Sequence, residues 1–364
     1  MNKILYFCRY SFEEVQIMFE DKKTKIYLIL IITFSVLLTS MSFYFYQAFF
    51  SPNALVDKEE PYLLKIPSNA TFQQVADSLY QNAVIHDLIT FGFVSKVMKY
   101  QEAVKPGLYT IPPKINNLNL VRLLRSGNQT PVNITFNNVR TKEDLSEKIT
   151  RNLEIDESSF LNLLSDSIYI MKFGFEQETI MSMFIPNTYE VWWNTSPENL
   201  FDRMYREYEK FWTESRKEKA ENIGLTPLEV STLASIVQAE TQKSDERPRV
   251  AGVYMNRLRI NMPLQADPTL VFAAGDFSIR RVLNVHKEID SPYNTYKYTG
   301  LPPGPINLPE ISALDAVLNY EGHSYLYFCA KDDFSGYHAF ATNLNDHLNN
   351  ARRYQAALNR AKIY

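Results

Sequence analysis

The feature that most constrains this chain is an apolar stretch near its N-terminus, Ile26–Phe50, which contains no charged residue. A helix rises about 1.5 Å per residue, so about 20 apolar residues cross the roughly 30 Å hydrocarbon core of a bilayer. The stretch is longer than the apolar part of a signal peptide, and no small-residue cleavage pattern follows it. We therefore predict one transmembrane helix over residues 26–50, with its Tyr- and Phe-rich end at a membrane surface.

The distribution of basic residues around this stretch predicts its orientation. Five Lys and Arg residues precede it, whereas only Lys58 and Lys65 lie among the twenty residues that follow it. The positive-inside rule then places the N-terminus in the cytoplasm. We expect a cytoplasmic tail at residues 1–25, anchorage in the inner (plasma) membrane, a linker at residues 51–60 and a periplasmic or extracytoplasmic body beyond it.

The body has an α+β pattern in two parts. Residues 61–130 predict a small β-α-α-β unit: Tyr62–Ile66 alternates like a strand, helices follow from Thr71 and over Asp87–Lys99, and a second strand ends at Ile111. A unit of this size with few charged residues is typical of a binding module. We expect residues 131–364 to form the α+β domain that carries the chemistry.

Composition excludes several classes of function. A net charge of −3 argues against a nucleic-acid binder that depends on phosphate contacts. The five histidines show no metal-ligand spacing, and neither a Walker A nor a dinucleotide-binding glycine pattern is present. Cys8 and Cys329 stand on opposite sides of the predicted span and cannot form a disulfide framework. We expect no metal and no cofactor.

The strongest chemical signal lies between residues 226 and 275. Thr226–Glu229 is a helix start with a capping box and an N1 proline. Apolar residues recur at helical spacing in Leu233–Val237, and the next position on that stripe is Glu240. Burial raises the pKa of a carboxyl group, as a general acid requires at neutral pH. The alternative is a structural salt bridge from Glu240 to one of three arginines, Arg247, Arg249 or Arg257.

Two further segments have the composition of ligand sites. Aromatic residues in Met183–Trp193 would either stack on sugar rings or fill the core. Rigid Gly- and Pro-containing loops over residues 293–306 carry Asn, Thr and Tyr, which is typical of binding loops.

Ordered motifs along the body resemble the membrane-anchored endolytic murein transglycosylase family, also called YceG-like. The motifs are Leu233–Thr241, Glu246-Arg247, Val250-Ala251, Asn256–Leu258, Leu264–Thr269, Tyr293–Tyr296, Gly300–Ile306, Tyr325–Phe328 and His338–Phe340. Residues 61–130, with Gly107–Tyr109, resemble the LysM-like module of that family.

The resemblance implies cleavage of the β-1,4 bond between N-acetylmuramic acid and N-acetylglucosamine in nascent peptidoglycan strands. The product carries a 1,6-anhydro end, and strand elongation stops. Because the sugar's own 6-hydroxyl attacks, one carboxyl group suffices: Glu240 would protonate the leaving oxygen and then accept the 6-hydroxyl proton. Membrane-bound peptidoglycan synthases are implied partners. Two alternatives stay open: a hydrolase in which Asp267 or Glu246 activates water, and a glycan-binding scaffold without activity.

The resemblance also implies roles for other residues. Side chains that would line the glycan cleft are Gln265, Asp267, Thr269, Tyr293, Asn294 and Tyr296. Glu246, Asn256 and Arg257 would support the site, with Glu246 paired to Arg257. For Asp267, local capping of the Asp-Pro turn is an equal alternative. The chain departs from the family pattern at Gln238, where a second Glu is frequent, which leaves Glu240 without a rival carboxylate there. It departs again at Asn138–Arg140, Met181-Ser182 and Asn187, so the resemblance assigns no sugar contacts to residues 130–195.

Overall fold

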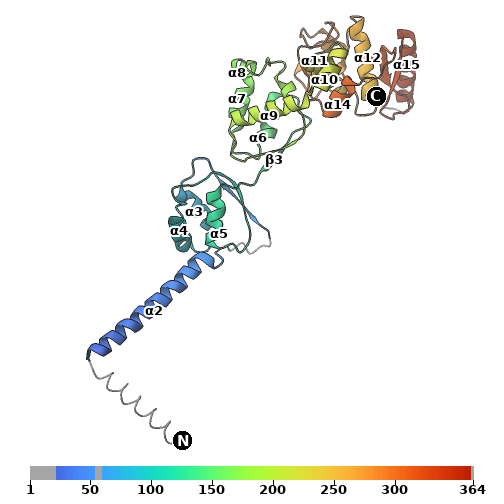
Figure 1. The fold of residues 1–364 in the computed structure, drawn as a ribbon. Coiled ribbons are helices and arrows are strands. Elements are labelled where there is room, and N and C mark those ends of the chain that lie inside the picture. Colours follow the sequence, from blue (N-terminus) through green and yellow to red (C-terminus); the bar gives the residue numbers. More distant parts are fainter. Residues whose placement is uncertain (1–21, 54–59, 362–364) are drawn as a thin grey trace. The chain divides into compact units, whose positions relative to one another are not determined.

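The computed structural model describes residues 22–53 and 60–361, and the chain divides into two compact units between Thr130 and Pro131 (Figure 1). Each unit is described by itself. Of the expected cytoplasmic tail, residues 1–21 lie outside the described residues, as do residues 54–59 of the expected linker.

The first unit begins with the long helix α2 (Lys22–Phe50), which confirms a continuous helix over the apolar stretch (Figure 1). Its 29 residues correspond to about 43 Å of helix, and its most apolar window has a mean hydropathy of 2.2. Nearly all of its large apolar side chains are exposed, and Ala48 alone is buried along it. By length and composition, α2 can cross a membrane.

The rest of the first unit has the predicted β-α-α-β order. Strands β1 (Tyr62–Ile66) and β2 (Gly107–Ile111) pair antiparallel, with Tyr62 opposite Ile111 and Ile66 opposite Gly107. Helices α3 (Phe72–Gln81) and α4 (Leu88–Val97) connect them, and α5 (Asn117–Ser126) follows. Inward side chains of all five elements form one core; among them are Leu64, Leu79, Phe91, Tyr109 and Leu120.

The end of α2 is joined to this module by buried amides, which corrects the expectation of a linker starting at residue 51. The Asn117 side chain donates to the Ala48 carbonyl at 2.8 Å, and Asn53 donates to the Asn117 side-chain oxygen at 2.6 Å. The Asn53 side-chain oxygen accepts the N–H groups of His86 and Asp87. Both asparagines are buried, so these bonds are required to satisfy their amides. Ser51–Asn53 therefore belongs to the folded module.

The second unit starts with a helical layer around a short strand pair. Strands β3 (Val132–Thr135) and β4 (Thr188–Val191) pair antiparallel. Around them lie α6 (Lys142–Thr150), α7 (Glu157–Ser165), α8 (Ser167–Met171), the 3₁₀ helix η1 (Ile180–Met183) and α9 (Pro197–Phe211). Phe184, Tyr189 and Trp193 are buried in or beside this core, while Trp192 is 51% exposed. Core packing, not sugar stacking, therefore accounts for most of the aromatics in Met183–Trp193.

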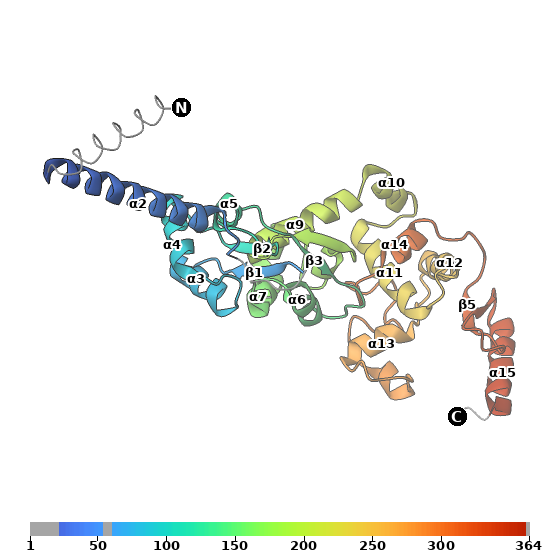
Figure 2. The ribbon, with the colours of Figure 1, turned by 90° about the horizontal axis from the view of Figure 1, so that it is seen from below.

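The remainder of the second unit is built around α11 (Pro227–Glu240). Helices α12 (Arg247–Arg259), α13 (Asp267–Ala274) and α14 (Ile311–Leu318) pack against it (Figure 2). The other elements are α10 (Glu214–Asn222), the 3₁₀ helix η2 (Asn284–Glu288), the hairpin β5 (Tyr327–Ala330) and β6 (His338–Ala341), and α15 (Leu344–Ala361). The capping box at Thr226 is confirmed. Every residue from Val230 to Val237 is buried, so α11 is a central helix buried all round, where a one-sided stripe was expected.

A Pro-rich loop crosses α11 and is fixed by polar side chains. The Ser235 hydroxyl accepts the Ile306 N–H at 3.0 Å, and the Asn307 side chain donates to the Ser235 carbonyl at 2.9 Å. At Gly304 a Cβ atom would stand 1.9 Å from the Glu178 carbonyl oxygen, so only glycine fits there. These contacts set the position of the loop beside the end of α11.

The amide junction of the first unit yields a prediction about its stability. Asn117→Ala leaves Asn53 and the Ala48 carbonyl without their partner, at a cost of about 1–3 kcal/mol. In hydrogen-exchange mass spectrometry of the full chain, we expect faster exchange in peptides that cover residues 48–53 and 86–87. Asn119→Ala, an exposed position on the same helix, is the control; equal exchange in both variants would contradict the junction.

Candidate active site

Glu240 is the last residue of α11, and its half-buried carboxyl group faces a cleft. The Tyr254 hydroxyl, on the neighbouring helix α12, donates to Glu240 Oε1 at 2.8 Å. Burial raises the pKa of Glu240 to about 7; the negative charge of Asp267 adds to this rise, whereas the Tyr254 hydrogen bond and the Arg257 charge oppose it. Near neutral pH this carboxyl group therefore exists in both protonation states.

The structural alternative for Glu240, a salt bridge, is wrong in this structure. Arg247 pairs with Glu310 at 2.9 Å, and Arg249 pairs with Glu321 at 2.9 Å. Arg257 donates to the backbone carbonyls of Leu326 and Leu264, each at 2.7 Å. Across residues 22–53 and 60–361, no ion pair engages Glu240, so its proton remains available.

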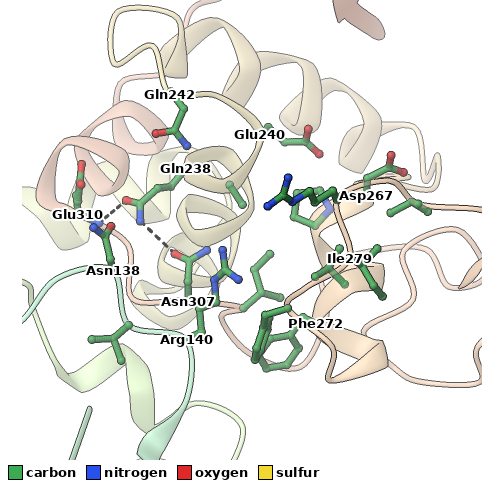
Figure 3. Close-up of a pocket in the computed structure, with 18 of the residues that line it drawn as sticks. Asn138, Arg140, Gln238, Glu240, Gln242, Asp267, Phe272, Ile279, Asn307 and Glu310 are labelled. Atoms are coloured by element: carbon green, nitrogen blue, oxygen red, sulfur yellow. Dashed lines mark hydrogen bonds between the residues drawn. The ribbon is translucent and has the colours of Figure 1, made fainter. Parts of the chain in front are cut away.

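Two adjoining cavities meet at Glu240. The larger, of about 850 Å³, and the smaller, of about 380 Å³, share Glu240 and Asp267 in their walls. Figure 3 shows the larger cavity, with Glu240 and Asp267 on one side and Gln238, Asn138 and Glu310 on the other. A chain-like ligand that filled both cavities would cross Glu240 somewhere along its length.

Asp267 lines both cavities, and Gln265 lines the smaller one. Asp267 is exposed there and accepts a hydrogen bond from the Tyr296 hydroxyl, while Gln265 and Tyr296 line the smaller cavity. The capping role considered for Asp267 is not found, since Ala266 is the N-cap of α13 and no side chain caps that helix. Tyr296 thus holds the Asp267 carboxylate near Glu240.

Three residues expected to contact a ligand instead hold the loops in place, which corrects that expectation. Thr269 and Asn294 are fully buried. Thr269 donates to the Ala266 carbonyl at 2.7 Å, and Asn294 donates to the carbonyls of Lys287 and Ile289. Tyr293 packs against Phe272 with the rings tilted at 50° and their centroids 4.7 Å apart. The sequence could not separate these roles from ligand binding, because polar loop residues serve both.

The predicted supporting residues join helices to the β5–β6 hairpin, but the expected pair between Glu246 and Arg257 does not form. Buried Glu246 accepts from His338 Nδ1 at 2.6 Å, from the His338 N–H at 2.8 Å and from the Thr241 hydroxyl at 3.1 Å. Asn256 donates to two hairpin-side carbonyls, those of His323 and Tyr325. The Arg257 guanidinium instead donates to the carbonyls of Leu264, in the loop before α13, and of Leu326, directly before β5.

Several cleft residues were missed by sequence reasoning. The bond from Tyr254 to Glu240 depends on how α11 and α12 cross, and no local pattern in the sequence shows this. Gln238 donates to the Leu308 carbonyl and accepts the Glu310 N–H at 2.7 Å. A glutamate there would lack the donor, so the amide suits this position.

The larger cavity also carries positive charge. Arg140, Arg280 and Arg281 line it, and no hydrogen bond or ion pair engages their guanidinium groups within the part of the chain that the structure describes. No local motif marked these arginines in the sequence. Among the described residues, no three His, Cys, Asp or Glu side chains group as metal ligands.

The raised pKa of Glu240 yields a prediction about stability. Folded Glu240 keeps its proton up to about pH 7, whereas an ordinary glutamate releases it near 4.5, so stability falls as pH rises between these values. Glu240→Gln removes the titrating carboxyl group and therefore this loss of folding stability. Above pH 7 we expect the variant to be about 3 kcal/mol more stable than the natural chain, with no difference below pH 4.5.

Urea unfolding at pH 4 and pH 8 measures this difference. Glu218→Gln, an exposed position in α10, is the matched control and is expected to change little at either pH. A Glu240→Gln chain with no gain at pH 8 would show that the carboxyl group is not destabilised by its surroundings.

The model of the YceG-like family matches residues 64–353. The chain is similar to an endolytic murein transglycosylase of Streptococcus pneumoniae, with 26% identity over 365 residues that cover 91% of this chain and 65% of the relative. It thus spans less than two thirds of that relative's length.

Two further proteins are also similar to this chain. An endolytic murein transglycosylase of Bacillus subtilis is 29% identical over 314 residues, covering 81% of this chain and 85% of its own length. The crystal structure of a yceG-like protein from Listeria monocytogenes has the same fold, with a TM-score of 0.54 and 24% identity over 80% of this chain and 99% of that one.

Proposed function

Because the chain belongs to the YceG-like family, we propose that it is an endolytic peptidoglycan lytic transglycosylase. It cleaves the β-1,4 bond between N-acetylmuramic acid and N-acetylglucosamine and leaves a 1,6-anhydro end on nascent glycan strands. The relatives described as endolytic murein transglycosylases support the substrate and the reaction.

One observation carries this proposal beyond the resemblance. Glu240, whose pKa lies near 7, stands where the two cavities adjoin. Sugars can therefore occupy sites on both sides of the carboxyl group. A site of this kind suits cleavage within a strand, whereas a closed end beside the acid would suit removal of terminal units.

The reaction needs one group that first gives and then takes a proton. Protonated Glu240 donates to the glycosidic oxygen as the bond to the anomeric carbon breaks. The 6-hydroxyl of the same muramic acid attacks that carbon, and Glu240, now a carboxylate, accepts the hydroxyl proton. No water is consumed, and Glu240 ends in its starting state.

Neighbouring residues have defined parts in this cycle. Tyr254 donates to Glu240 and stabilises its charged state between the two proton transfers. Positive charge develops at the anomeric carbon in glycoside cleavage, and we assign its stabilisation to the Asp267 carboxylate, which accepts a hydrogen bond from Tyr296. Gln265 and Tyr296 supply polar groups to the smaller cavity.

We propose that α2 anchors the protein as a single-pass span, with the N-terminus in the cytoplasm and the enzyme domain outside the membrane. The excess of basic residues before the apolar stretch supports this orientation. The β-α-α-β module would act as a LysM-like unit, and membrane-bound synthases that extend strands would be its partners.

Of the two residues considered as the base of a hydrolase, Glu246 is poorly suited to that role. Glu246 is buried and its carboxylate already accepts three hydrogen bonds, so it has no room to activate water. Asp267 remains the only proposed base for such a reaction. A scaffold without activity would bind strands and leave their length unchanged.

The products distinguish these possibilities. We expect the full chain to convert peptidoglycan strands into anhydro-ended fragments, and Glu240→Gln to lower the rate by about 10²–10⁴-fold, as loss of a general acid does. Mass spectrometry of the fragments is the measurement, since an anhydro end lacks the water that a reducing end carries.

Glu218→Gln serves as the control and should cleave like the natural chain. If the natural chain produced reducing ends and Asp267→Asn did not, the hydrolase would be supported. Anhydro ends formed undiminished by Glu240→Gln would mean that another residue is the acid, and binding without shortening would favour the scaffold.

The pH dependence of cleavage gives a separate prediction. Because the free enzyme must hold the Glu240 proton, kcat/KM should fall about tenfold per pH unit above about pH 7. Tyr254→Phe removes a bond that lowers the pKa of Glu240, so the fall should begin at a higher pH. A pH–rate profile checks both chains; an unshifted limb in Tyr254→Phe would show that this bond does not tune the acid.

A further inference from the structure

Helix α4 of the first unit has an apolar side that the rest of the described chain leaves largely exposed. Lys96 is its only charged residue. Ile89 is 78% exposed and Val97 is 55% exposed, with half-buried Phe93 midway between them. Spacing by four residues puts these three side chains on one face of the helix. We call Ile89, Phe93 and Val97 the α4 apolar face.

This face continues the surface of α2. The Phe93 ring contacts three aromatic rings from the last turns of α2, with centroids 6.1 Å from Tyr44, 5.5 Å from Phe45 and 6.2 Å from Phe49. Apolar side chains of the two helices therefore form one continuous surface.

Helix geometry indicates the depth of this contact in a bilayer that α2 crosses. From Ile26 to Phe45 the helix rises about 30 Å, which is the thickness of the hydrocarbon core. If the core begins at Ile26, its other boundary falls near Phe45, the level at which Phe93 packs. Tyr44 and Tyr46 lie at the same level, where amphipathic aromatic rings favour the membrane surface.

The junction keeps α4 at that level. Asn117 binds the Ala48 carbonyl at the end of α2, and Asn53 binds the Asp87 carbonyl at the start of α4. Asp87 also caps α4 through the N–H groups of Ile89 and Thr90. The α4 apolar face cannot move away from the end of α2 without breaking these bonds, of which the one from Asn117 to Ala48 is buried.

We propose that α4 is an interfacial helix, with its apolar face immersed at the boundary between lipid headgroups and acyl chains. The inference rests on the proposed anchoring by α2 and adds a second contact with the same lipid leaflet. Lys96 lies in the last turn of α4 and can extend its ammonium group to the headgroups while its stem stays with the apolar face. The first unit is then held against the bilayer, not merely tethered to it.

Depth measurements on the full chain in liposomes test this inference. In a background that carries Cys8→Ser and Cys329→Ser, single substitutions Ile89→Cys and Val97→Cys would each receive an environment-sensitive fluorophore. Quenching by nitroxide-labelled lipids is compared with quenching by aqueous iodide. We expect the lipid-to-aqueous ratio at both positions to exceed, several-fold, the ratio at Asn69→Cys. Asn69 is exposed in the turn between β1 and α3 and is the matched control.

A label at Leu38→Cys, in the middle of α2, reports the anchor separately. Deep lipid quenching at Leu38 with water-like labels at both 89 and 97 would overturn the inference and leave the face to a partner protein. A water-like label at Leu38 would overturn the anchor and the inference with it. Cleavage of isolated strands by the same labelled chains in detergent tests the proposed reaction independently, since Glu240 belongs to the other unit.

Discussion

Burial of α11 on all sides is the constraint on which the candidate site depends. Val230–Val237 pack against surrounding helices, and the helix ends at Glu240 just where the packing opens into the cleft. The carboxyl group is therefore partly removed from water while it stays reachable, and its pKa rises. A destabilised charged state lowers folding stability above neutral pH, and the same feature suits a proton donor.

Most polar residues in the recognisable motifs serve to position backbone around this acid. Ser235 and Gln238 fix the 306–310 loop, Asn294 closes the loop after η2, and Glu246 ties the start of α12 to β6. Each is buried or half-buried, and each has its hydrogen-bonding groups satisfied within the unit. Among the described residues, few are left to meet a ligand: Glu240 and Asp267 lie at the centre, and the larger cavity adds arginines whose guanidinium groups form no hydrogen bond or ion pair.

The first unit uses the same principle for a different purpose. Two buried asparagines, Asn53 and Asn117, join the end of α2 to the module, so the helix and the module move together. If α2 spans the bilayer as proposed, α4 then lies at a fixed depth beside it. For a proposed enzyme on nascent strands, this geometry would keep the first unit close to the membrane where such strands are made.

The sequence by itself determined many of the elements and singled out Glu240 as the candidate acid. Local signals such as the Thr226 capping box, the apolar stretch of α2 and the strand alternation at Tyr62–Ile66 depend on neighbours within a few residues, and the helices and strands formed where these signals stood. Only tertiary structure decided the partners. The bonds from Tyr254 to Glu240, from His338 to Glu246 and from Asn117 to Ala48 join residues between 14 and 92 positions apart, and Thr269 and Asn294 are buried by packing that no local pattern encodes. Side-chain type predicts which groups can bond, whereas the crossing of helices and the docking of loops determine which groups meet.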